Sequence, residues 1–111
     1  MTGPAISEAQ FQKQVIQLAQ LLGWRVAHFR AAQTSRGWRT PVAADGAGFP
    51  DLVLARRGQL IFAELKTQRG KLSNAQECWQ EALSGEQPND ERVIVTVWRP
   101  SDWSAIDNAL K

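Results

Sequence analysis

The chain has few of the residues that mark secreted or membrane proteins. Its single cysteine, Cys78, has no partner for an intrachain disulfide, which favours a reducing compartment. No apolar run approaches the ~18 residues of a membrane-spanning helix. Residues 1–4 lack the basic and apolar regions of a signal peptide. We therefore expect a cytoplasmic protein without a membrane partner.

Acidic residues are scarce in the middle of the chain. Residues 25–71 include nine arginines and lysines, whereas only Asp45, Asp51 and Glu64 are acidic there. The small net charge of +2 conceals this asymmetry, because most of the other acidic residues lie C-terminal to this segment. A basic region around a few carboxylates favours a polyanionic partner, with the carboxylates reserved for a metal ion.

The sequence pattern predicts one α/β domain over residues 1–111. Ser7-x-x-Gln10 and Ser73-x-x-Gln76 are capping boxes that each begin a helix. Apolar periodicity and turn residues give the order α-β-β-β-α-β-α, with bounds near 8–22, 24–29, 49–55, 60–66, 74–84, 92–98 and 101–110.

We therefore expect a central mixed sheet flanked by helices. Residues 1–6 are expected to form a flexible tail, and residues 30–48 a long basic loop. Loops of this length inside a compact domain are usually functional or disordered.

The most informative residues are Asp51, which follows Pro50, and the run Glu64-Leu65-Lys66. Side chains alternate along a strand, so Glu64 and Lys66 point to one face and Leu65 to the other. If the strands at 49–55 and 60–66 pair as a hairpin, Asp51 approaches Glu64 closely enough for both to bind one divalent cation.

This arrangement suits the metal-assisted hydrolysis of a phosphodiester. Mg²⁺ or Mn²⁺ prefers oxygen ligands and retains waters, so Asp51, Glu64 and the backbone carbonyl of Leu65 are candidate ligands. Lys66 would position the attacking water and stabilise developing negative charge. The simpler alternative is a surface ion pair, because Glu-x-Lys is frequent on strands. The scarcity of other acidic residues favours the metal site.

Glu8 is a further candidate, because it lies three residues before Phe11 and seven before Val15. This spacing places it on the inward stripe of the first helix, where a carboxylate needs a partner.

Gly48-Phe49-Pro50-Asp51-Leu52-Val53, followed by Ala63-Glu64-Leu65-Lys66, resembles the PD-(D/E)xK nuclease signature as it occurs in the VRR-NUC family. The family also has a glutamate at the start of its first helix, matched by Glu8, and a glutamine after the lysine strand, matched by Gln76. The resemblance covers residues 7–98 and implies a restriction-endonuclease-like core. It implies catalytic roles for Glu8, Asp51, Glu64, Lys66 and Gln76, with Glu8 assisting the metal or its water.

The resemblance further implies a Mg²⁺- or Mn²⁺-dependent, structure-selective DNA endonuclease related to Holliday-junction resolvases. Such an enzyme would cut four-way junctions or flaps during replication, repair or recombination, in a bacterial cell or a phage-infected host. Because a chain this small offers little surface for two duplex arms, we expect a homodimer. The alternatives are a non-catalytic DNA-binding module of the same fold and a sequence-specific restriction-type endonuclease.

The candidate DNA-binding residues are Arg30, Arg36, Trp38, Arg39, Arg69 and Lys71. The first four would form a phosphate-binding loop with one stacking aromatic, and the last two follow the Lys66 strand closely. A solvated loop is the alternative for 30–48.

Other residues favour structural roles. His28 is expected to be half-buried with a backbone partner rather than to contact a phosphate. Cys78, Trp79, Trp98 and Trp103 are expected in the core.

Overall fold

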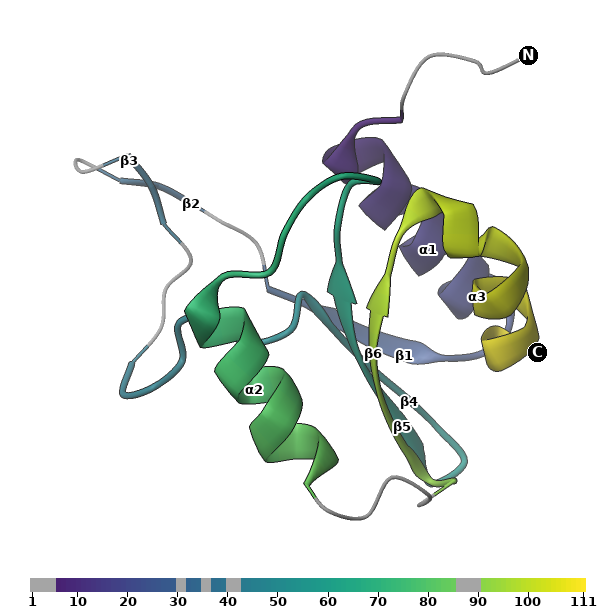
Figure 1. Cartoon of the computed structure of the whole chain (residues 1–111). Helices are drawn as coiled ribbons and strands as arrows, with labels where there is room; N and C mark the ends of the chain where they lie inside the picture. The colour runs from purple at the N-terminus through teal and green to yellow at the C-terminus, as the bar shows by residue number, and fades with distance from the viewer. Residues whose placement is uncertain (1–5, 30–31, 35–36, 40–42, 86–90) are drawn as a thin grey trace.

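The computed structural model describes residues 6–29, 32–34, 37–39, 43–85 and 91–111 (Figure 1). Its elements are α1 Glu8–Leu21, β1 Arg25–His28, β2 Ala32–Thr34, β3 Gly37–Arg39, β4 Leu52–Arg56, β5 Gln59–Leu65, α2 Asn74–Ser84, β6 Val93–Trp98, the 3₁₀ segment η1 Pro100–Asp102 and α3 Trp103–Leu110. None of the helices in these ranges is long and apolar enough to cross a membrane.

Four strands form one mixed sheet in the order β1-β4-β5-β6. The pairs β1–β4 and β4–β5 are antiparallel, whereas β5 and β6 are parallel because α2 carries the chain back between them. The predicted α/β class, with a mixed sheet and flanking helices, is confirmed.

The predicted order of elements is incomplete. Residues 30–48 were expected to be an irregular loop, but they contain the antiparallel pair β2–β3, which stands away from the main sheet in Figure 1. These strands have only three residues each and lack the alternating apolar pattern by which a strand is identified in sequence.

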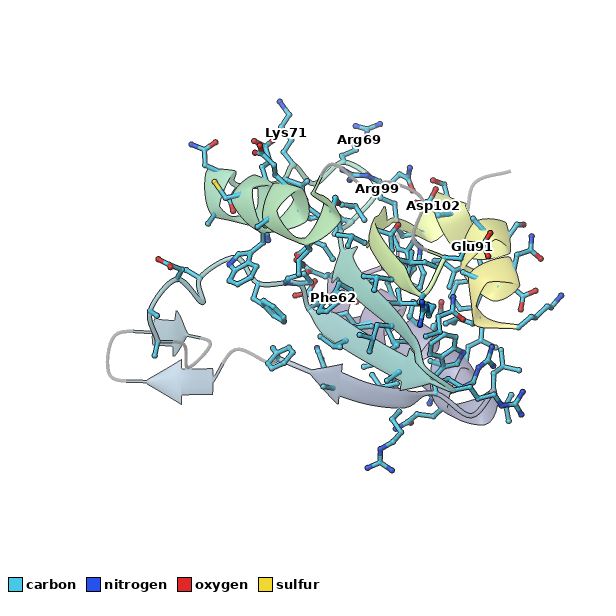
Figure 2. The ribbon with its side chains drawn as sticks, turned by 90° about the horizontal axis from the view of Figure 1, so that it is seen from below. Phe62, Arg69, Lys71, Glu91, Arg99 and Asp102 are labelled. Atoms are coloured by element: carbon cyan, nitrogen blue, oxygen red, sulfur yellow. The ribbon has the colours of Figure 1, made fainter. Side chains whose placement is uncertain are left out.

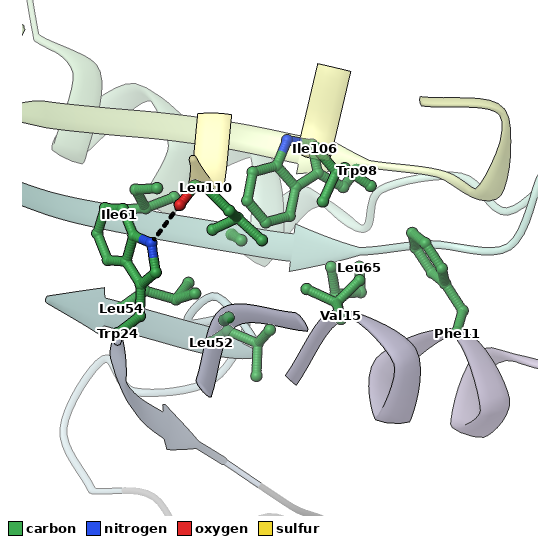
Figure 3. Packing of buried hydrophobic residues seen from close by; sticks show 12 residues of the cluster. Phe11, Val15, Trp24, Leu52, Leu54, Ile61, Leu65, Trp98, Ile106 and Leu110 are labelled. Atoms are coloured by element: carbon green, nitrogen blue, oxygen red, sulfur yellow. Dashed lines mark hydrogen bonds between the residues drawn. The ribbon is translucent and has the colours of Figure 1, made fainter. Parts of the chain in front are cut away.

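The hydrophobic core lies between one face of the sheet and the helices α1 and α3 (Figure 3). Leu52 and Leu54 of β4 and Ile61 and Leu65 of β5 are completely buried there, because alternate residues of a strand share a face. Phe11, one of the buried residues of α1, packs against this layer.

The intervening residues of β4 and β5, including Val53 and Phe62, belong to the opposite face, where none is completely buried apart from Glu64. In Figure 1 the helix α2 lies on this side, and it contributes no buried residue of its own. This second face is therefore less completely covered than the first.

A two-residue turn sets the pairing of β4 with β5. Arg57 and Gly58 both have positive φ, at 50° and 81°, as a type I′ hairpin turn requires. Arg56 pairs with Gln59 across this turn, and the register of every later pair follows from it.

Arg56 connects the C-terminal ends of α1 and α3. Its guanidinium donates to the carbonyls of Leu22 at 2.8 Å and Leu110 at 3.0 Å, and it stacks 4.4 Å from the centre of the Trp24 ring. Trp24 Nε1 also donates to the Leu110 carbonyl at 2.9 Å, as drawn in Figure 3. The C-terminal carbonyls of α1 and α3 are thereby joined through a cation that their dipoles favour.

Both predicted capping boxes are present, at Ser7 and at Ser73. Ile6 is partly buried against the core, so the predicted flexible tail is wrong at this residue, and residues 1–5 lie outside the described ranges. Ile6 holds the N′ position of α1 and Phe11 the N4 position, which are the two positions of a hydrophobic staple.

Two further expectations about the core are wrong. Cys78 is exposed on α2, because this helix turns that face away from the sheet. Trp103 at the start of α3 is 37% exposed, because the buried stripe of that helix runs through Ile106 and Leu110. Trp98, by contrast, is buried as predicted, and Trp79 is partly buried.

Candidate active site

Asp51 and Glu64 lie directly opposite each other in the sheet. Leu52 pairs with Ala63, so one further step along both antiparallel strands pairs Asp51 with Glu64. Both side chains point to the face opposite the α1–α3 core, because Leu52 and Ala63 on either side of them are buried in that core. The predicted approach of the two carboxylates is confirmed.

Asp51 is fixed by a hydrogen bond in which its Oδ2 accepts from the backbone N–H of Leu65 at 2.9 Å. In the sheet, Lys66 donates its N–H to β6, so the backbone groups of its neighbour Leu65 point toward β4. The register places Pro50 opposite Leu65, and proline has no N–H for the Leu65 carbonyl. The sequence Pro50-Asp51 thus supplies a carboxylate to the Leu65 amide while offering no backbone donor to its carbonyl.

Glu64 is the one buried charged side chain among the described residues, with 2% of its surface exposed. Burial, followed by the charge of Asp51 and a side-chain hydrogen bond with Asp51, raises the pKa of Glu64 to about 8. The nearby charge of Lys66 opposes this shift, whereas that of Glu8 adds to it. At neutral pH Glu64 therefore keeps its proton more readily than an ordinary glutamate does.

Two carboxyl groups in contact mark a place where a cation fits. Two carboxylates in contact repel each other unless a proton or a metal ion lies between them. Among the described residues no group of three His, Cys, Asp or Glu side chains lies close enough to bind a metal. The donor set is thus two carboxylates and the Leu65 carbonyl, which suits a hard cation that keeps several of its waters.

Gln76 links the capping box of α2 to Glu64. Its Oε1 accepts from the Ser73 N–H at 2.8 Å, and its Nε2 donates to Glu64 Oε1 at 3.0 Å. Because the cap fixes which end of the amide is oxygen, the NH₂ group must face Glu64. The resemblance pointed to Gln76 as a supporting residue, and this geometry gives it a physical task.

Gly48 sets how closely the start of α2 approaches the site. Its φ is +83°, and a Cβ built on it would lie 2.6 Å from the Ala75 backbone carbon and 2.7 Å from the Gln76 nitrogen. Trp79 Nε1 further ties the helix to the Asp45 carbonyl at 2.9 Å. The segment before Asp51 therefore holds Gln76 in place, which the sequence motif alone did not indicate.

Arg99 holds the loop that follows Lys66. Its Nη1 donates to the carbonyls of Thr67 at 2.7 Å and Gly70 at 2.6 Å. A Cβ on Gly70 would lie 3.5 Å from Lys66 Cδ, so the tightly folded loop also confines the lysine stem. Sequence reasoning missed Arg99, because no residue pattern signals a side chain that binds backbone carbonyls 30 positions away.

Glu8 is exposed, so the prediction that it faces inward is wrong. It occupies the first turn of α1, before the buried stripe begins at Phe11. Its charge still reaches Glu64 and raises the pKa of that residue.

Arg69 and Lys71 are exposed and extend away from the body in Figure 2, above the loop that Arg99 holds. Arg30 and Arg36 lie outside the described residues, and Trp38 and Arg39 belong to β3, whose backbone alone is described. All six predicted DNA contacts, Arg69 and Lys71 included, remain predictions.

His28 is half-buried and pairs with Leu52, so it belongs to the face opposite Asp51 and Glu64. This position favours the structural role expected for it.

Neither a scan against protein-family models nor a search of curated proteins finds a match for this chain. The resemblance to the VRR-NUC family therefore stays a prediction that the residues themselves carry.

The close approach of Gly48 to α2 predicts an unequal effect of two glycine substitutions. Gly48→Ala and Gly58→Ala introduce a side chain at nearly the same φ, +83° and +81°, but only Gly48 has neighbours within 4 Å. We expect Gly58→Ala to lower the free energy of unfolding by about 1 kcal/mol. Gly48→Ala should lower it by about 2–4 kcal/mol, because the start of α2 must also move.

Urea denaturation of the two variants measures both values. Equal losses would show that the contact between Gly48 and α2 is unimportant.

The raised pKa of Glu64 predicts a pH-dependent stability in metal-free buffer. The folded protein holds the proton of Glu64 more tightly than the unfolded chain, so stability falls as pH rises from 4.5 toward about 8. The side chain introduced by Glu64→Gln cannot ionise, so the variant should not show this fall. Its free energy of unfolding minus that of wild type should therefore be about 1–3 kcal/mol larger at pH 8 than at pH 5.

The check is urea denaturation with a chelator at both pH values, with exposed Glu77→Gln as the control. Parallel pH profiles for wild type and Glu64→Gln would contradict the assignment.

Proposed function

We propose that the chain is a metal-dependent endonuclease of the restriction-endonuclease-like type, which hydrolyses DNA phosphodiesters at branched structures such as four-way junctions or flaps. The observation that carries the proposal is the contact between Asp51 and buried Glu64, two carboxyl groups on adjacent strands beside Leu65 and Lys66. The likeness of these residues to the VRR-NUC signature supports the choice of DNA as substrate.

Asp51, Glu64 and the Leu65 carbonyl would hold Mg²⁺ or Mn²⁺. The ion would supply Lewis-acid stabilisation of charge on the phosphate and acidify a bound water. Glu64 must lose its proton to serve as a ligand, and the donated hydrogen bond from Gln76 supports the charged carboxylate that results.

Lys66 would orient the attacking water and stabilise negative charge. It lies two residues from Glu64 on the same face of the strand, and its charge acts on that carboxylate. Its ammonium would hold the attacking water by a hydrogen bond and stabilise the negative charge that develops on the phosphate oxygens. Glu8, which is exposed and whose charge reaches Glu64, would orient a water rather than bind the metal directly.

Arg69 and Lys71, which follow Lys66 in the chain, would bind the DNA backbone. Both are exposed and follow Lys66 within five residues, in a loop that Arg99 fixes to the start of η1. Such contacts supply affinity without sequence preference, which suits an enzyme that recognises DNA structure. A role in replication, repair or recombination in the cytoplasm of a bacterial cell or phage-infected host follows from the resemblance.

The catalytic proposal predicts different effects for three lysine substitutions. Lys66→Ala should lower the cleavage rate about 10²–10⁴-fold while DNA affinity stays within about threefold of wild type. Lys71→Ala should mainly lower the affinity for DNA and make that affinity less dependent on salt concentration. Exposed Lys13→Ala on α1 is the matched control and should change neither property.

Cleavage is measured on four-way junction, flap, splayed-arm, single-stranded and linear duplex DNA with Mg²⁺ or Mn²⁺. Full activity in Lys66→Ala, prepared free of contaminating nuclease, would refute the catalytic assignment. Binding without any cleavage by wild type would instead identify a DNA-binding module, and cleavage of one sequence in linear duplex would identify a restriction-type enzyme.

The small size of the chain supports a homodimer as the working form. Two opposed strands of a junction require two active sites, and a twofold dimer presents two identical ones. Multi-angle light scattering should therefore give about twice the 12.4 kDa chain mass, with or without junction DNA. A chain that stays monomeric in both conditions would contradict this part of the proposal.

A further inference from the structure

The aromatic residue Phe29 lies beside the candidate metal site. Its N–H donates to the Asp51 carbonyl at 3.0 Å, and the β1–β4 register places the two residues directly opposite each other. Phe29, Asp51 and Glu64 thus form one row across three strands, and side chains in such a row share a face. The row runs from an exposed ring to a buried carboxyl group, because Phe29 is 44% exposed and Glu64 only 2%.

A cluster of aromatic rings supports Phe29 from one side. Its ring meets that of Phe49 edge-to-face, with centroids 5.3 Å apart and an angle of 85°. Phe49 in turn packs against Phe62, which is labelled on the sheet in Figure 2, and against Trp79. These contacts fix the ring without covering it, so a planar ligand can stack there at little cost in side-chain entropy.

The row places the Phe29 ring beside both carboxyl groups of the candidate site. Neighbouring strands lie ~4.8 Å apart, so the backbone of Phe29 lies one strand spacing from Asp51 and two from Glu64. Ala27, the preceding residue of β1 on this face, is small and exposed, so it leaves the approach to the ring open. Exposed single apolar residues are common, but Phe29 belongs to the same row as the site residues Asp51 and Glu64.

We propose that Phe29 is a stacking platform for an unpaired nucleobase whose nucleotide carries or adjoins the scissile phosphate. The proposal rests on the nuclease function proposed above and narrows its substrate class to DNA with a splayed or unpaired nucleotide at the cleavage position. A fully paired duplex keeps its bases stacked on each other and cannot use the platform without paying for unpairing.

The test is a double-mutant cycle between the ring and the base. Cleavage of a splayed-arm substrate is compared with that of substrates carrying an abasic residue at each position around the cleavage site. Wild type, Phe29→Ala, Phe29→Leu and Phe29→Trp are assayed on each substrate. Trp103→Ala is the matched control, because Trp103 is similarly exposed at 37% but belongs to α3 on the opposite face of the sheet.

We expect Phe29→Ala and Phe29→Leu to lower kcat/KM about 5- to 100-fold on the intact substrate. An abasic residue at one position should lower the kcat/KM of wild type by a similar factor. On that abasic substrate, Phe29→Ala and Phe29→Leu should have the same kcat/KM as wild type. Phe29→Trp should retain activity. Phe29→Leu keeps an apolar side chain against Phe49, so it separates loss of stacking from loss of packing.

Equal losses on intact and abasic substrates would overturn the stacking role, because a structural effect does not depend on the base. Conversion of a dimer to a monomer by Phe29→Ala, without coupling to the base, would overturn it in favour of a protein interface. Absence of cleavage by wild type on every substrate would refute the nuclease function itself, and the stacking role with it.

Discussion

The contact between the Asp51 and Glu64 carboxyl groups is the constraint on which the site depends. Two acidic groups in contact, one of them almost completely buried, are unstable as two anions, and the raised pKa of Glu64 is the consequence. A protein gains no stability from such a pair, so its presence on a partly covered sheet face indicates a function. A divalent cation is the ligand that relieves the repulsion most directly.

The surrounding structure keeps this pair together. The two-residue turn at Arg57-Gly58 fixes the register that places Asp51 opposite Glu64. Pro50 leaves the Leu65 carbonyl without a donor from the paired strand, and Gly48 lets the start of α2 approach closely enough for Gln76 to reach Glu64. These local features all act on the geometry of the same site.

Much of this arrangement could be predicted from the sequence, because short-range rules govern it. The two-residue period of strands and a hairpin turn sufficed to bring Asp51 to Glu64, and the two Ser-x-x-Gln boxes located the helix starts. The contacts of Arg99 and Gly48 with distant backbone were missed, since long-range backbone contacts leave no periodic signal. The exposure of Glu8 was missed because a helical stripe gives direction but not the point where the core ends.

The central claim is that a metal ion binds at Asp51 and Glu64 and displaces the proton of Glu64, and calorimetric titration tests it most directly. Mn²⁺ is added to the protein at pH 7 in two buffers of different ionisation enthalpy, and the difference in heat gives the protons released. We expect close to one proton released per ion bound, and little release by Glu64→Gln. Tight binding of Mn²⁺ to wild type with no proton release, or equal binding and release by Glu64→Gln, would contradict the account.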